Sequence, residues 1–160
     1  MSKVVPGYTT AEMDGDFVVF LIGMRINKWW KLHKWVPVFT AMTPMIAELI
    51  RHPERGLLKY STWIGPRGPL MVQYWRSVEH LEEFAKDARL PHRPAWRKYN
   101  RTVGDGGDVG VWHETYVVRD GRFEVLYGNM PVVGLAAAGR SVPVTRTTRS
   151  AASRRAVNAA

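Results

Sequence analysis

The spacing of apolar residues in the first third of the chain predicts a strand followed by a long helix. Residues 17–26 form a continuous apolar run rich in β-branched and aromatic side chains, which is typical of a buried strand. Between residues 28 and 52, apolar side chains recur at helical spacing and form one stripe. Pro37 and Pro44 interrupt this stripe, so we expect a kinked or broken helix.

The middle of the chain predicts a hairpin followed by a second helix. Apolar runs at residues 57–64 and 70–76 flank a segment whose glycines and prolines indicate a tight turn. Ser77 is a typical N-cap residue, and the apolar side chains on one face of residues 77–87 predict an amphipathic helix.

The last third of the chain predicts two more strands. Residues 109–119 form the fourth strand, Asp120-Gly121 is a common hairpin turn, and residues 123–127 are expected to return as a fifth strand. The element order β-α-β-β-α-β-β is the ferredoxin-like arrangement with one strand added. We therefore expect an α+β fold whose antiparallel sheet carries its helices on one face and has its other face covered by a partner.

Charge and composition divide the chain into three predicted parts: an N-terminal arm over residues 1–16, a domain over residues 17–139 and a basic tail over residues 140–160. The tail contains five arginines and no acid, so subtracting its charge from the net charge of +9 leaves +4 for the rest. The tail lacks aromatic residues and is rich in Ser, Thr, Ala and Arg, so we expect it to be disordered. We expect the tail to be exposed to solvent and to bind neither a membrane nor a nucleic acid.

The absence of cysteine narrows the chemistry. A chain without cysteine can form no disulfide, thiolate nucleophile, zinc–cysteine site or thiolate-ligated haem. Residues 1–16 lack the apolar run of a signal peptide, and no uninterrupted apolar stretch reaches about 18 residues, so we expect a cytoplasmic protein. The sequence also lacks a glycine-rich phosphate loop, a nucleophile elbow and a nucleotide-binding fingerprint.

Several segments of the chain resemble one protein superfamily. Residues 74–85 resemble the strand-to-helix junction of the antibiotic-biosynthesis-monooxygenase superfamily, and His92 follows this junction at a similar place. Residues 17–144 are similar to a bacterial family labelled monooxygenase family protein. The segments that carry this similarity are Phe20–Asn27, Leu90–Trp96, Gly110–Tyr116 and Tyr127–Pro131. The resemblance implies a ferredoxin-like dimeric α/β barrel that forms a homodimer.

The resemblance also implies a function and a cofactor. The superfamily includes cofactor-free oxygenases, haem-degrading enzymes and haem-dependent aldoxime dehydratases, and the fold does not choose among them. The leading expectation is a monooxygenase-like oxidoreductase that acts on a small hydrophobic molecule, with haem b as candidate cofactor and His92 as the ligand of its iron. The alternatives are a cofactor-free oxygenase, a haem-dependent dehydratase that breaks an N–O bond, and a non-catalytic module that binds haem or a small molecule. From its neighbours alone, His92 equally fits a structural role at a helix end.

Two ionisable residues on the predicted fourth strand are candidate catalytic groups. Strand alternation places His113 in an otherwise apolar row and Glu114 on the opposite face, between two aromatic residues. We expect one of the two to be partly buried, where a pKa shifted toward neutrality would suit a general acid or base. The alternative is a hydrogen-bonded core histidine together with a carboxylate paired to Arg25.

Aromatic residues occur at a density that suits a pocket for a flat hydrophobic ligand. The expected substrate pocket comprises Trp75, Trp96, Trp112, Tyr116 and Arg25. The same aromatic residues equally suit a core or a dimer interface. Basic residues are also interleaved with tryptophans over residues 25–35, a pattern that occurs at membrane interfaces and in single-stranded nucleic-acid sites. Here we expect a solvated helix start.

Overall fold

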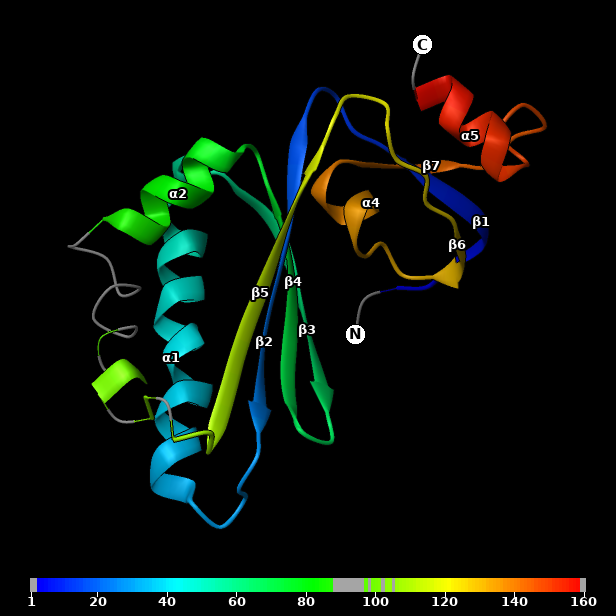
Figure 1. Cartoon of the computed structure of the whole chain (residues 1–160). Coiled ribbons are helices and arrows are strands. Elements are labelled where there is room, and N and C mark those ends of the chain that lie inside the picture. The colour runs from blue at the N-terminus through cyan, green and yellow to red at the C-terminus, as the bar shows by residue number, and fades with distance from the viewer. Residues whose placement is uncertain (1–2, 88–96, 98, 102, 105, 159–160) are drawn as a thin grey trace.

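Four antiparallel strands form the central sheet in a computed structural model, which describes residues 3–87, 97, 99–101, 103–104 and 106–158. The strands lie in the order β3-β4-β2-β5 (Figure 1). Their bounds are Phe17–Ile26 for β2, Leu57–Gly65 for β3, Gly68–Trp75 for β4 and Val109–Val118 for β5. The first four predicted strands are therefore confirmed.

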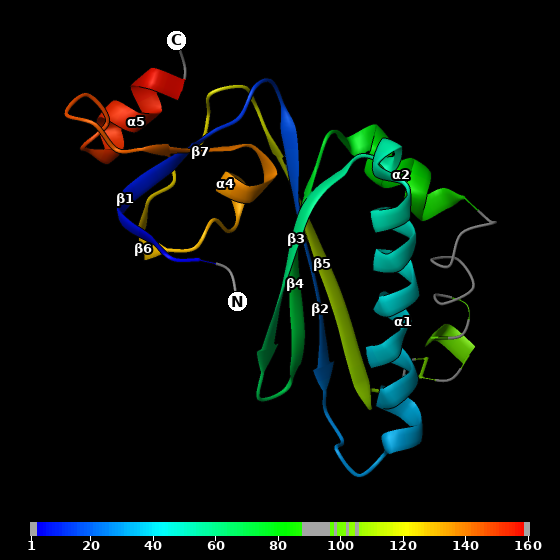
Figure 2. The same ribbon diagram turned by 180° about the vertical axis from the view of Figure 1, so that it is seen from behind.

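The connections between these strands define the fold. Helix α1 (Leu32–Arg51) connects β2 to β3, and helix α2 (Val78–Lys86) lies between β4 and β5 in the chain. Both helices lie on the same face of the central sheet (Figures 1 and 2). A β-α-β-β-α-β order with this strand arrangement is the ferredoxin-like fold, which confirms the predicted α+β class.

Strand β2 takes a central place that suits its apolar sequence. It pairs along its whole length with β5 and over residues 18–23 with β4. Elements also pack against both of its faces, since Val18 belongs to the core under α1 while Phe17 belongs to a second core on the other side. A strand that is covered on both faces typically has a continuous apolar sequence.

Helix α1 runs without a break over 20 residues, through both Pro37 and Pro44. Each proline removes a backbone hydrogen bond from the helix, and burial of the apolar stripe against the sheet offsets that loss. The core under the helix comprises Val18, Met45, Ile46, Leu49, Trp75 and Phe84. Of the two predicted forms, kinked or broken, the broken helix is therefore wrong. No helix among the described residues, α1 included, is long and apolar enough to cross a lipid bilayer.

Helix α2 begins at the predicted cap. The backbone of Ser77 is extended, and its Oγ accepts a hydrogen bond from the backbone N–H of His80 at 3.4 Å. Phe84 is buried on this helix, with its ring centroid 5.9 Å from that of Trp75. The 3₁₀ helix η1 (Pro53–Arg55) precedes β3 and lies beside α2.

A second, smaller sheet lies on the face of the central sheet opposite α1 and α2 (Figures 1 and 2). Its strands are β6 (Tyr127–Met130), β1 (Val5–Glu12) and β7 (Arg140–Pro143), in that order, with helix α4 (Leu135–Ala138) beside them. The buried residues between the two sheets are Ala11, Phe17, Leu135 and Ala136. Both views show this sheet beside one end of the central strands only.

The predicted hairpin after β5 is wrong. The chain does turn at Asp120-Gly121, where the N–H of Arg122 bonds the carbonyl of Arg119 at 2.9 Å, but residues 122–126 form no strand. The next strand, β6, pairs with β1 instead. Phe123 explains the difference, because its ring packs edge-on against Phe17 at 5.5 Å and directs the chain into the second core.

Both ends of the chain differ from the prediction. Residues 5–12, expected within an N-terminal arm, form β1, and the expected disordered tail contains β7 and helix α5 (Ala151–Asn158). Arg154 anchors α5: its side chain is 5% exposed, and its Nε donates to Glu124 Oε1 at 2.6 Å. Composition does not reveal this order, because it reflects the capacity for apolar burial and not strand pairing or a buried ion pair.

Candidate functional site

A groove of about 1350 Å³ runs between helix α1 and the face of the central sheet that this helix covers. The α1 wall extends from Lys34 to Ile50, a length of about 24 Å at 1.5 Å per residue. The opposite wall contains residues from all four strands of the sheet. The groove opens to solvent beside Phe39 and Ile50, whose side chains are exposed on the helix.

The sheet wall of the groove carries an imidazole and several hydroxyl groups. His113 and Thr115 of β5 lie on the side that faces α1, as do Tyr60 and Thr62 of β3. The ring of His113 packs against Phe20, with 5.6 Å between the ring centroids. Strand alternation brings these residues to one face. The groove therefore combines their imidazole and three hydroxyls with a largely apolar helix wall, which also includes Lys34, Thr40 and Thr43.

Glu114 and Tyr116 lie on the opposite face of β5 from His113. The Tyr116 hydroxyl donates a hydrogen bond to Glu114 Oε2 at 2.6 Å, and this bond raises the pKa of Tyr116. Arg25 donates instead to Asn27 Oδ1 at 3.1 Å, so the expected pairing of Glu114 with Arg25 is not formed. Within one chain, His113 and Glu114 therefore cannot reach the same bound molecule.

The expectation that His113 or Glu114 would be partly buried is wrong, since both are exposed. Among the described strands, β5 pairs with β2 alone, so it is an edge of the sheet. Helix α1 faces β5 across the groove and does not pack closely against it. The alternation of residues along a strand predicts which side chains share a face, but not which elements of the fold cover that face.

Trp75 is a core residue and not part of the groove. It is 1% exposed, packs against Phe84, and donates from Nε1 to Gln73 Oε1 at 2.9 Å. The expectation that it lines a substrate pocket is therefore wrong. Trp112 borders the groove, but strand alternation directs its indole to the face opposite α1, where it lies over Gly23. The predicted ligand His92 and the predicted pocket residue Trp96 lie outside the described residues.

The helix wall of the groove was missed by the sequence analysis. Met42, Met45 and Ile46 line the groove from α1, whereas the sequence predicted only that the helix has one apolar stripe. The sequence does contain an indication of this wall. The apolar stripe on α1 is wider than the buried core requires, because it includes Phe39 and Ile50, which are exposed. Side chains of this kind suit the wall of an apolar site as well as a core.

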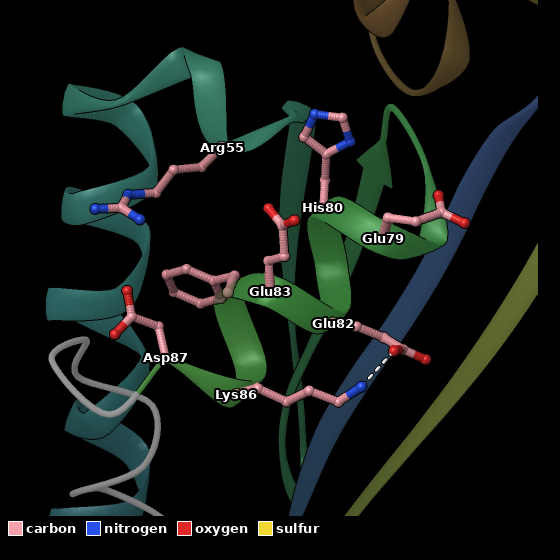
Figure 3. Close-up of a pocket in the computed structure, with 8 residues that line it drawn as sticks. Arg55, Glu79, His80, Glu82, Glu83, Lys86 and Asp87 are labelled. Atoms are coloured by element: carbon pink, nitrogen blue, oxygen red, sulfur yellow. Dashed lines mark hydrogen bonds and ion pairs between the residues drawn. The ribbon is translucent and has the colours of Figure 1, made fainter.

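Another cavity, of about 680 Å³, lies between α2 and the residues around η1. Figure 3 shows its charged side chains, including Lys86 and Glu82, whose Nζ and Oε2 are 2.5 Å apart. A hydrogen bond from Ser77 lowers the pKa of Glu79 in its lining, because it favours the charged carboxylate. No group of three or more potential metal ligands occurs among the described residues. This cavity suits water and ions, and the groove is the better candidate for an apolar ligand.

Solved structures with a similar fold include two that are described as an oxygenase and as a dimer. SnoaB, a cofactor-independent oxygenase from Streptomyces nogalater, matches with a TM-score of 0.46 and 10% identity over 65% of this chain and 94% of that chain. A dimeric ferredoxin-like protein from Jannaschia sp. CCS1 matches with a TM-score of 0.47 and 14% identity over 64% of this chain and 99% of that chain.

Sequence comparison gives the family. The chain is 30% identical over 153 residues to a protein named Monooxygenase af470 from Aspergillus fumigatus, covering 81% of this chain and 53% of that protein. The chain thus spans about half the length of this curated relative. The family model described as Monooxygenase af470-like matches residues 17–135, which include the whole central sheet and α1. The chain therefore belongs to the monooxygenase af470-like family.

Proposed function

We propose that the protein is a monooxygenase-like oxidoreductase that binds a small hydrophobic molecule in the groove between α1 and the central sheet. The observation that carries this proposal is the combination of an apolar groove with the imidazole of His113 on its wall. Ligand sites of this kind join apolar walls to a few placed polar groups. Membership of a family named for a monooxygenase supports the reaction class.

In the cofactor-free form of this function, His113 is the general base. Its imidazole would accept a proton from an acidic C–H of the substrate, and the resulting carbanion would reduce O₂. The overall change R–CH₂–R′ + O₂ → R–CO–R′ + H₂O is balanced, because the methylene group supplies all four electrons. One oxygen atom enters the product and the other leaves as water. The hydroxyls of Tyr60, Thr62 and Thr115 are available to hold a polar group of the substrate.

Oxygen uptake with an anthrone, a flat ketone with an acidic methylene group, tests this function. We expect His113→Gln to lower the rate by about 100-fold or more, since a placed general base contributes that much. His33→Gln is the matched control, because His33 is exposed on α1 and does not line the groove. Equal rates in the two variants would rule out His113 as the base. Binding without oxygen uptake by the unmodified protein would favour a non-catalytic binding module.

Haem b remains a second candidate from the sequence, with His92 as its proposed ligand. Bound haem would supply oxygen activation or, in the dehydratase alternative, N–O cleavage. The described groove residues offer the apolar lining that a porphyrin needs. An absorption spectrum after incubation with hemin tests this candidate: a Soret band that disappears in His92→Ala supports it. A protein that stays colourless excludes it.

We propose further that the protein forms a homodimer through the face of the central sheet opposite α1. Support comes from the exposed aromatic residues Trp63, Trp112 and Tyr116, which lie beyond the area that the second sheet covers. Large exposed apolar patches commonly mark interaction sites. Light scattering would measure the mass in solution. A dimer that becomes monomeric in Trp63→Glu supports this interface, and a wild-type monomer contradicts it.

A further inference from the structure

Two connections meet at one end of the central sheet, which we call the tryptophan end and define as residues 27–34 and 64–68. The first segment leads from β2 into α1 and the second contains the turn between β3 and β4. Both views place these segments at the same end of the molecule (Figures 1 and 2). A backbone hydrogen bond of 2.7 Å from Ile26 N–H to the Arg67 carbonyl joins them.

Large apolar side chains are exposed at the tryptophan end. Trp30 is 76% exposed, Ile64 70% and Leu32 58%, and Trp29 is also exposed. Trp29 and Trp30 stand on the connection into α1, Leu32 is the first residue of that helix, and Ile64 lies at the end of β3, so all four are close to the two connections. Single exposed apolar side chains are ordinary, but a group of them on adjoining segments indicates an interaction site.

The tryptophan end is also strongly basic. Its two segments contain Lys28, Lys31, Lys34 and Arg67 and no acidic residue. Asp108 is the neighbouring acid, with carboxylate oxygens 2.7 Å from Lys28 Nζ and 2.9 Å from Lys31 Nζ. Among the described residues of this end, the basic side chains therefore outnumber the carboxylate that pairs with two of them. The ion pairs also tie the connection into α1 to the residues before β5, which holds the tryptophans in place.

We propose that the tryptophan end is a membrane-docking surface that binds anionic lipid headgroups and inserts its apolar side chains at the interface. Tryptophan prefers the level of the headgroups, where its ring is in apolar surroundings and its N–H meets water. Lysine and arginine are attracted to an anionic leaflet, each by roughly a fivefold gain in binding. Exposed apolar residues surrounded by positive charge match both properties of such a surface.

A single-stranded nucleic acid is the rival partner for this mixture of residues, and the structure favours the lipid. Nucleic-acid binding of this kind requires aromatic rings on which bases stack within a basic groove. Ile64 and Leu32 are exposed to a similar degree as Trp30, yet offer no stacking surface. Exposed aliphatic side chains beside such connections suit insertion among acyl chains.

Docking would also explain how an apolar molecule reaches the groove, a consequence that rests on the proposed function. Lys34 and Ile64 belong both to the tryptophan end and to the lining of the groove. The groove therefore extends to the end of the molecule where the bilayer would lie. A lipophilic substrate dissolved in the membrane could pass into the groove without crossing water. No membrane partner was predicted from the sequence, because the exposure of a tryptophan depends on the folded structure.

Sedimentation with lipid vesicles tests the docking surface on the full chain and requires no substrate. We expect binding to vesicles of phosphatidylcholine with 30 mol% phosphatidylserine, weaker binding at 0.5 M salt, and little binding to phosphatidylcholine alone. Trp30→Ala combined with Ile64→Ser should weaken binding about tenfold or more, through lost apolar burial. Arg67→Glu should weaken it by a similar factor. Val157→Ser, on an exposed apolar residue of α5, is the control and should bind normally.

Several results would overturn the proposal. One is equal sedimentation of all variants, or no sedimentation with phosphatidylserine vesicles. Another is a dimer that becomes monomeric in the Trp30 and Ile64 double variant, which would make this end a protein interface. A third is a gel shift of a single-stranded oligonucleotide with the same variant dependence and no vesicle binding. Circular dichroism and thermal melting would show that each variant is folded, so that a loss of binding reports on the surface.

Discussion

At the scale of single residues, Asp108 stabilises the connection that begins helix α1. Its carboxylate is nearly buried and pairs with Lys28 and Lys31, and its backbone carbonyl accepts hydrogen bonds from the N–H groups of Asn27 and Lys28. The two lysines lower the pKa of Asp108 from 3.8 to about 2, because hydrogen bonds to them favour the charged carboxylate.

Asp108→Asn should therefore destabilise the protein in a pH-dependent manner. The folded pKa lies below the ordinary value, so the stabilisation is fully present above about pH 4 and is lost as the pH falls toward 2. Thermal melting at pH 7 should show a lower midpoint for the variant, and the difference should shrink at pH 2–3. The control is Glu82→Gln, which breaks an exposed pair with Lys86 and should change little. A difference that stays constant with pH would contradict the role of the charge.

Gly23 is the second residue whose identity has a specific structural reason. An added Cβ at this position would lie 2.7 Å from the indole of Trp112, whereas one at Gly110 would meet its nearest neighbour at 3.7 Å. Gly23→Ala should displace Trp112 and cost about 1 kcal/mol, and Gly110→Ala should be tolerated. Urea unfolding and tryptophan fluorescence would measure both effects. An unchanged spectrum in Gly23→Ala would show that the indole does not lie over this glycine.

At the scale of elements, helix α5 is attached mainly through Arg154. Besides its ion pair with Glu124, Arg154 donates from one nitrogen to the carbonyls of Thr148 and Arg149, each at 3.0 Å. Removing it leaves three buried or partly buried acceptors without their donor.

Arg154→Ala should lower the free energy of unfolding by about 3 kcal/mol, the cost of breaking a buried ion pair from one side. Arg155→Ala is the matched control, since the neighbouring arginine is exposed and its loss should have little effect. Chemical denaturation would compare the two variants, and limited proteolysis would show whether the last helix opens. Equal stability of the two variants would mean that α5 is not anchored by Arg154.

Elements with a strong local pattern were predictable from the sequence, and elements defined by distant partners were not. The apolar run of β2 and the Ser77 cap of α2 each encode their structure within a few residues. By contrast, β6 has a four-residue sequence whose partner, β1, lies more than 110 residues away. The same difference applies to single residues. Local alternation predicts which residues of β5 share a face with His113, whereas the burial of Trp75 depends on its contacts with Phe84 and α1.

At the scale of the whole molecule, a helix-covered sheet leaves a groove on one face and an exposed aromatic area on the other. The proposed site uses the first face, with His113 as its polar centre. Thr115 and Glu114 are neighbours on β5 that point to opposite faces, so they provide a pair of variants that distinguishes the two faces. Thr115→Trp would fill the groove beside His113, and Glu114→Gln would leave the groove unchanged.

The most direct test of the proposed function is the origin of the oxygen atom in the product. Under ¹⁸O₂, mass spectrometry of the anthrone product should show one labelled oxygen atom for the wild type and for Glu114→Gln, and almost no product for Thr115→Trp. Labelled product formed by Thr115→Trp at the wild-type rate would contradict the groove as the site. Oxygen derived from water rather than from ¹⁸O₂ would contradict a monooxygenase.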